Sequence, residues 1–204
     1  MNKQRDSLPL LNAAVAFVIL IPVLLLAISF KFAGSGPPPP PPPANDQPPI
    51  IVLRETDGYY FSSGSADLST DFQEKLARVV APRLQQVLKK YDCDLIEVIG
   101  HTDSQPVVAT SKSNLDKELL PTLHGQSNSL LPGSNADLGL MRAWSVILVL
   151  REHAAWPGIH FFGYSAAQTI DVNGNVTAAG APSIDPSRRR IEVRVRRSPS
   201  GTKP

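Results

Sequence analysis

The stretch IEVIGHTDSQPVV, residues 96–108, combines a strand pattern with a cluster of chemically active side chains. Apolar and polar residues alternate in its first half, which is typical of a β-strand. The chain then turns at Gly100, and Pro106 prevents a simple continuation of the strand. Between these two positions lie a histidine, a hydroxyl and a carboxylate: His101, Thr102 and Asp103. The segment is therefore predicted to be a strand that ends in a candidate site.

Further strand patterns lie on both sides of this segment. Short, mostly apolar or alternating runs bounded by turn residues predict strands. The four predicted strands cover residues 50–55, 94–100, 158–164 and 188–196.

Two segments between these strands have the apolar spacing of helices. The first begins near Ser69 and should kink at Pro82, and the second begins at Asn135 or Asp137. Residues 104–134 are rich in Ser, Asn, Pro and Gly, which predicts a long loop or insertion. We therefore predict an α/β domain of the α+β sandwich type. Its order is β-α-β-α-β followed by a last strand, with a mixed sheet and two main helices packed on it.

Composition excludes several classes of function. The chain has 204 residues and a formal net charge of +2, so no basic excess points to nucleic acid. Cys93 is the only cysteine, and therefore no intrachain disulfide or Cys/His zinc cluster is possible. The four histidines are scattered, and no set of ligands has the spacing of a metal site. We expect neither a metal nor a cofactor.

The N-terminal part of the chain predicts a membrane anchor. Residues 8–30 carry no charge, and their length matches the roughly 30 Å hydrocarbon core of a bilayer. We assign a transmembrane helix to residues 8–32, and Lys3 and Arg5 favour a cytoplasmic location for residues 1–7. A cleaved signal peptide is the alternative, but its apolar core would be shorter and would end in small residues.

The rest of the chain divides into a linker, a domain and a tail. Residues 33–49 contain a proline run that adopts polyproline II and acts as a stiff spacer. The globular domain extends over residues 50–197, and residues 198–204 form a loose tail. The arginines of residues 188–197 could bind phosphate, although a solvated strand face is the plainer interpretation.

Five stretches of the domain resemble the OmpA-like peptidoglycan-binding family, the C-terminal module of OmpA-type porins and MotB-type stator proteins. They are FSSGSADL (61–68), IEVIGHTDSQP (96–106), NADLGLMRAWSVILVL (135–150), GYS (163–165) and RRIEVRV (189–195). The chain departs from the family at Gly139, where Ser is usual, and at Arg188, where Asn is common. The stretch between the second and third motifs is also unusually long.

The resemblance implies non-covalent binding of peptidoglycan through the diaminopimelate of its stem peptide, without enzymatic activity. The chemistry agrees, because an ionised Asp103 suits the ammonium of this zwitterion and the forked guanidinium of Arg142 suits its carboxylate. By resemblance, Thr102, Asn135 and Leu138 shape the pocket and Arg189 supports it. The alternative is that Asp103 and Arg142 form a plain structural ion pair.

This layout implies a single-pass protein of the bacterial inner membrane, with its C-terminal domain in the periplasm. Its partners would be peptidoglycan, the lipid bilayer, and a polytopic inner-membrane protein or a second copy of the chain. The main rival is a MotB/ExbD-like stator subunit of an ion-driven complex. Such helices carry an ion-binding Asp, where this chain has Asn12, and Asp6 lies before the apolar run. A wall hydrolase is disfavoured, because no acid-base pair is apparent.

Overall fold

The computed structural model describes residues 47–108, 112–126, 129–178 and 180–198, and residues 47–204 form one compact unit. Within the described residues, no helix is both long and apolar enough to cross a membrane. The predicted transmembrane helix of residues 8–32 lies outside them, as do residues 1–7 and most of the linker.

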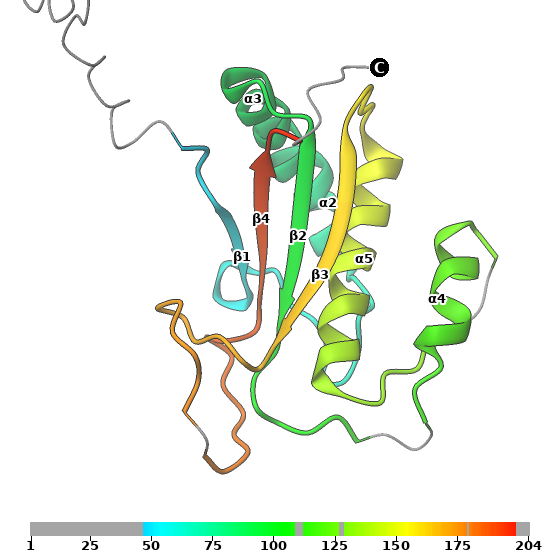
Figure 1. Cartoon of the computed structure of the whole chain (residues 1–204), viewed down its shortest axis with the longest axis vertical. Helices are drawn as coiled ribbons and strands as arrows, with labels where there is room; N and C mark the ends of the chain where they lie inside the picture. Colours follow the sequence, from blue (N-terminus) through cyan, green and yellow to red (C-terminus); the bar gives the residue numbers. More distant parts are fainter. Residues whose placement is uncertain (1–46, 109–111, 127–128, 179, 199–204) are drawn as a thin grey trace, which may run out of the picture. The chain divides into compact units, whose positions relative to one another are not determined.

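A four-stranded mixed sheet forms one layer of the domain (Figure 1). The strands in spatial order are β1 (Ile51–Arg54), β4 (Arg190–Arg196), β2 (Leu95–His101) and β3 (His160–Ala167). β4 is antiparallel to both of its neighbours, whereas β2 and β3 are parallel. β2 is buried along nearly its whole length, since strands flank both of its edges. The predicted mixed sheet is confirmed.

The helices cover one face of this sheet (Figure 1). They are α2 (Thr70–Lys75), a π-helical turn η2 (Leu76–Val80), α3 (Ala81–Tyr91), α4 (Leu115–Leu123) and α5 (Asn135–His153), with a short 3-10 helix η1 (Glu55–Asp57) after β1. Ser69 caps α2 by accepting a hydrogen bond from the backbone N–H of Phe72. The wider π turn immediately precedes Pro82, which has no N–H to donate, so the helix accommodates the proline there.

The hydrophobic core lies between the sheet and these helices. Its fully buried large side chains include Phe72, Leu76, Leu84, Ile96, Val98, Ile147, Leu150, Ile191 and Val193. Burying each such side chain contributes about 1.5–3 kcal/mol. All members of the core lie between residues 51 and 195, so residues 47–204 contain a complete core and are a self-contained folding unit.

The prediction of a loop over residues 104–134 was wrong in part, because α4 lies within it. Only Leu115 of this helix is buried, so the sequence shows no apolar stripe. Contacts across the segment hold its start: the side chain of Asn114 donates to the Ser129 carbonyl (2.9 Å) and accepts from the Leu131 N–H (2.7 Å). A helix held by such contacts leaves little periodic signal in the sequence.

Candidate functional site

A cavity of about 340 Å³ opens at the end of the sheet where β2 stops. The structure brings all six predicted site residues together around it: Thr102, Asp103, Asn135, Leu138, Arg142 and Arg189. Segments on either side of α4 add an apolar wall made by Val107, Val108, Leu131 and Pro132. The segment between the second and third sequence motifs therefore contributes directly to the candidate site.

The close approach of β2 to α5 positions the polar groups. A Cβ at Gly100 would lie 2.0 Å from the carbonyl oxygen of Gly139, so glycine is needed where the strand crosses the helix. The side chain of Asn135, in the first turn of α5, donates to the carbonyls of Asp103 (3.4 Å) and Gln105 (3.0 Å). These contacts hold the segment after β2 against the start of α5.

Asp103 is only 5% exposed, and both of its carboxylate oxygens accept hydrogen bonds. Oδ1 accepts from the backbone N–H of Gln105 (3.2 Å). Oδ2 accepts from the backbone N–H of Asp185 (3.2 Å) and from Nη1 of Arg189 (3.0 Å). This carboxylate therefore has a fixed position at the wall of the cavity.

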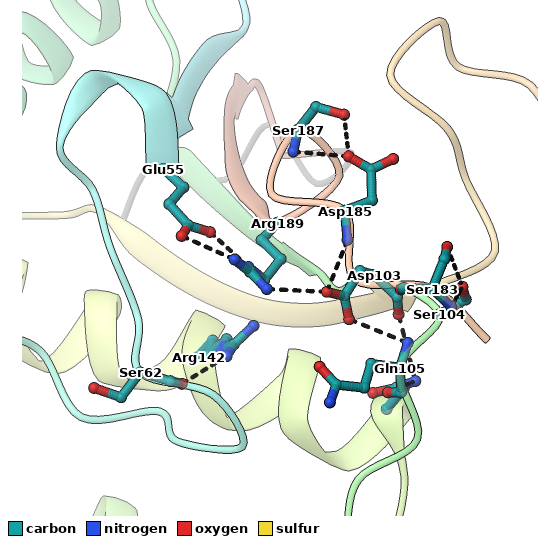
Figure 2. A network of polar contacts seen from close by, with 11 residues as sticks. Glu55, Ser62, Asp103, Ser104, Gln105, Arg142, Ser183, Asp185, Ser187 and Arg189 are labelled. Atoms are coloured by element: carbon teal, nitrogen blue, oxygen red, sulfur yellow. Dashed lines mark hydrogen bonds and ion pairs between the residues drawn. The ribbon is translucent and has the colours of Figure 1, made fainter.

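Arg189 also binds a second carboxylate, that of Glu55 (Figure 2). Its Nε and Nη2 donate to the two oxygens of Glu55 at 2.5 and 2.9 Å, a bidentate pair. This hydrogen bonding raises the pKa of Arg189. Glu55, Arg189 and Asp103 thus form a triad of two carboxylates and one guanidinium, with a net charge of −1.

Arg142 is 2% exposed and binds no carboxylate in the described part of the chain. Nε and Nη2 donate to the backbone carbonyls of Ser65 (2.9 Å) and Ser62 (3.2 Å), and the guanidinium lies 4.8 Å from the centre of the Phe61 ring. Burial, together with the charge of Arg189, lowers its pKa to about 10. The alternative of a structural ion pair between Asp103 and Arg142 is therefore wrong.

Thr102 contributes a second unsatisfied group at the cavity. Its backbone N–H donates to the carbonyl of Ala167 at 2.8 Å, which fixes the residue beside the end of β3. Its hydroxyl oxygen is buried and has no hydrogen-bond partner among the described residues. A buried hydroxyl of this kind is available to a ligand in the cavity.

His101 lies outside the set that lines the cavity, as expected for a packed residue at the end of a strand. Its Nε2 is 3.3 Å from Oε1 of Glu192, and the imidazole, with Arg194 and Arg190, lowers the pKa of that carboxyl strongly. The interpretation of residues 188–197 as a solvated face was wrong at Arg188 and Arg190, which are buried.

The buried arginines next to β4 have partners within the domain. Arg188 donates to the carbonyl of Gln168 and to the hydroxyl of Thr177, and Arg190 forms an ion pair with Glu192. Their donors therefore hold loops together instead of forming an open phosphate site.

The sequence analysis missed Glu55 and the carbonyls of Ser62 and Ser65. Glu55 directly follows β1, whose end lies beside the start of β4, so strand pairing could have indicated it. The two serines lie in FSSGSADL, which was noted as a motif without a role for its backbone. Across the described residues, no group of three or more His, Cys, Asp or Glu side chains is placed to hold a metal ion.

Comparison with solved structures shows a related architecture. The periplasmic domain of Helicobacter pylori MotB superimposes with a TM-score of 0.50 at 20% identity, covering 76% of this chain and 80% of that one. The chain shares the fold of that domain. The cell wall anchor of the T6SS from Pseudomonas aeruginosa is more distant, with a TM-score of 0.39 at 20% identity over 73% of this chain and 81% of that one. No protein-family model and no curated protein matches the chain.

Proposed function

We propose that this domain binds peptidoglycan non-covalently through the diaminopimelate of the stem peptide, and so tethers a membrane or a membrane complex to the cell wall. One observation carries the proposal: the buried guanidinium of Arg142 has no carboxylate partner among the described residues and lines the same cavity as a triad with a net charge of −1. A buried cation is costly unless it is paired, so the cavity is suited to a ligand that brings a carboxylate.

The free end of diaminopimelate is an ammonium beside a carboxylate, and the cavity offers a complement to each. The triad of Glu55, Arg189 and Asp103 supplies the negative field for the ammonium. Nη1 of Arg142 makes no hydrogen bond within the described residues, and with the Thr102 hydroxyl it is free to donate to the carboxylate. Figure 2 shows Asp103 and Arg142 approaching from the end of β2 and from α5, with Arg189 between them and Glu55.

The apolar wall complements the rest of this ligand. Diaminopimelate has an aliphatic chain between its two charged ends. Leu138 from α5 and the wall made by Val107, Val108, Leu131 and Pro132 offer a surface for that chain. The domain holds its ligand without chemical conversion, and we propose no enzymatic activity and no cofactor.

We propose that residues 8–32 anchor the chain in the bacterial inner membrane and that the domain faces the periplasm. The uncharged run and the Lys3/Arg5 bias support this topology, and the shared fold with a periplasmic domain agrees with it. N-terminal sequencing of the membrane-extracted protein should find the anchor still attached. A mature chain beginning near Gly36 would contradict the anchor.

Co-sedimentation with purified peptidoglycan tests the binding proposal. Residues 47–204 should sediment with sacculi, and free diaminopimelate should compete. Lysine is the matched control ligand, because it has the side-chain ammonium without the adjacent carboxylate, and it should compete poorly. Equal competition by both ligands, or no sedimentation of the folded domain, would refute the assignment.

A MotB-like stator subunit is the second candidate, favoured by the shared fold with MotB. In that case, the chain and a polytopic partner would conduct ions. Asn12 stands where such helices carry an ionisable Asp, so we expect no proton flux in vesicles that contain the protein and any co-purified partner. Flux that disappears on Asp6→Asn would favour the stator function.

A further inference from the structure

β3 is an edge strand whose outer side is not paired with any described strand (Figure 1). The backbone N–H of His160 donates inward to the carbonyl of Asp94, beside β2. Because hydrogen-bonding direction alternates along a strand, Phe161, Gly163 and Ser165 direct their N–H and C=O groups outward. An edge of this length presents a row of groups that can pair with another strand.

The usual protections of an edge strand are missing from β3. The strand HFFGYSAA contains no proline and no Lys, Arg, Asp or Glu over its eight residues. The opposite edge strand, β1, has only four residues and follows Pro48 and Pro49 closely. Of the two edges of the sheet, β3 is therefore the one open to pairing.

Two large aromatic side chains lie on the open face of β3. Phe162 is 47% exposed and Tyr164 is 45% exposed, with their rings packed edge-to-face at 6.5 Å. The other face of the strand is already occupied, because Phe161 packs on Trp156 and Gly163 lies against Trp144 of α5. Further burial of this strand can thus occur only on its open face and along its outer edge.

We propose that two copies of this chain pair through β3, antiparallel and around a two-fold axis at Gly163, to form a continuous eight-stranded sheet. Gly163 faces itself in this register and exchanges both of its backbone hydrogen bonds, as do Phe161 and Ser165 across the axis. Phe162 lies directly opposite Tyr164 of the second copy, on the open face. These two form a non-hydrogen-bonded pair, in which cross-strand side chains approach most closely.

The chemistry of β3 favours a second copy as the occupant of this edge. A strand without charged residues meets its own copy without like-charge repulsion. The register also places His160 opposite Ala166, so the two imidazoles stay apart. A twofold arrangement satisfies the same groups on both chains, which is how most homodimers close.

Site-specific disulfides test the register. Full-length chains with Cys93→Ala, carrying either Phe162→Cys or Tyr164→Cys and different tags, should crosslink efficiently when mixed. Phe162→Cys alone should crosslink poorly, because position 162 does not face itself in this register and its two copies are too far apart for a disulfide. Val176→Cys, at another exposed site, controls for random collision. Absence of the 162–164 crosslink above that control would overturn the register.

Sedimentation of residues 47–204 tests the interface itself. Phe162→Lys should raise the dimer dissociation constant about tenfold or more, because each dimer contains the altered pair twice. Mixing Phe162→Lys with Tyr164→Glu chains should restore a heterodimer, since the two charges then face each other. Val176→Lys is the matched control and should leave the dimer unchanged. A monomer at all accessible concentrations, a dimer unaffected by Phe162→Lys, or β3 pairing only with unrelated peptides would overturn the proposal.

Discussion

Replacement of Arg142 by alanine should abolish most binding to peptidoglycan while leaving the domain folded. The truncation removes a cavity-facing donor and a positive charge from a site that is shielded from water. Losing one partner of such a desolvated charge contact costs about 2–5 kcal/mol of binding. Because each 1.4 kcal/mol is a factor of ten, the dissociation constant should rise about 30- to 4,000-fold.

The effect of this truncation on stability should be smaller than its effect on binding. Two hydrogen bonds to carbonyls, from Nε and Nη2, are lost. Relief from burying a cation without a carboxylate partner offsets part of that loss, and water in the cavity can reach the freed carbonyls. We expect the free energy of unfolding to fall by about 1–3 kcal/mol.

Arg142→Lys separates charge from geometry. Lysine has one ammonium, and it cannot replace two donors to the carbonyls of Ser62 and Ser65 while also reaching the ligand. It should therefore bind almost as weakly as Arg142→Ala. Arg151→Ala, an exposed position of the same helix, is the matched control and should bind like the unaltered domain.

The assay is titration of residues 47–204 against purified peptidoglycan, with the bound fraction measured after sedimentation and the fold of each variant checked by circular dichroism. Undiminished binding by a folded Arg142→Ala variant would refute the reasoning. It would mean that the guanidinium only holds the 62–65 backbone in place.

Three further outcomes are expected. Glu55→Ala should weaken peptidoglycan binding by about tenfold, because Arg189 then neutralises the remaining carboxylate alone; unchanged sedimentation would exclude this role. Glu192→Gln should lower the free energy of unfolding by about 1–3 kcal/mol at pH 7. Folding lowers the pKa of Glu192, so its contribution is present above the unfolded value of about 4.3 and lost as pH falls through the folded value; the difference in urea unfolding should shrink toward pH 2. Gly100→Ala should lower it by about 1–3 kcal/mol or more, because the Cβ meets helix backbone at 2.0 Å, whereas Gly180→Ala, with open space around it, should unfold normally in urea.

Much of the candidate site followed from local sequence. Strand alternation up to Gly100 located the end of β2, and the polar residues after it necessarily lie at that edge of the sheet. The apolar spacing from Asn135 onward placed Arg142 two turns into α5. Six residues from three segments could therefore be predicted to meet, because strand ends and helix starts in such folds share one edge.

The partners of these residues could not be predicted. The ion pair of Asp103 is with Arg189, and Arg142 is held by carbonyls of the 62–65 turn. Backbone carbonyls have no sequence identity, so no motif can announce them as acceptors. Glu55 meets Arg189 across 134 positions of the chain, a separation that only strand pairing closes.

By itself, the sequence determined the order of the main elements, the mixed sheet and the segments that bear the site, because side-chain periodicity is a local property. The tertiary structure alone decided that α4 exists, that Arg188 and Arg190 are buried, and which charges neutralise each other. Those outcomes depend on distances between segments far apart in the chain. Burial and ion pairing are properties of the folded arrangement, so they are settled only when β1, β2, β4 and α5 meet.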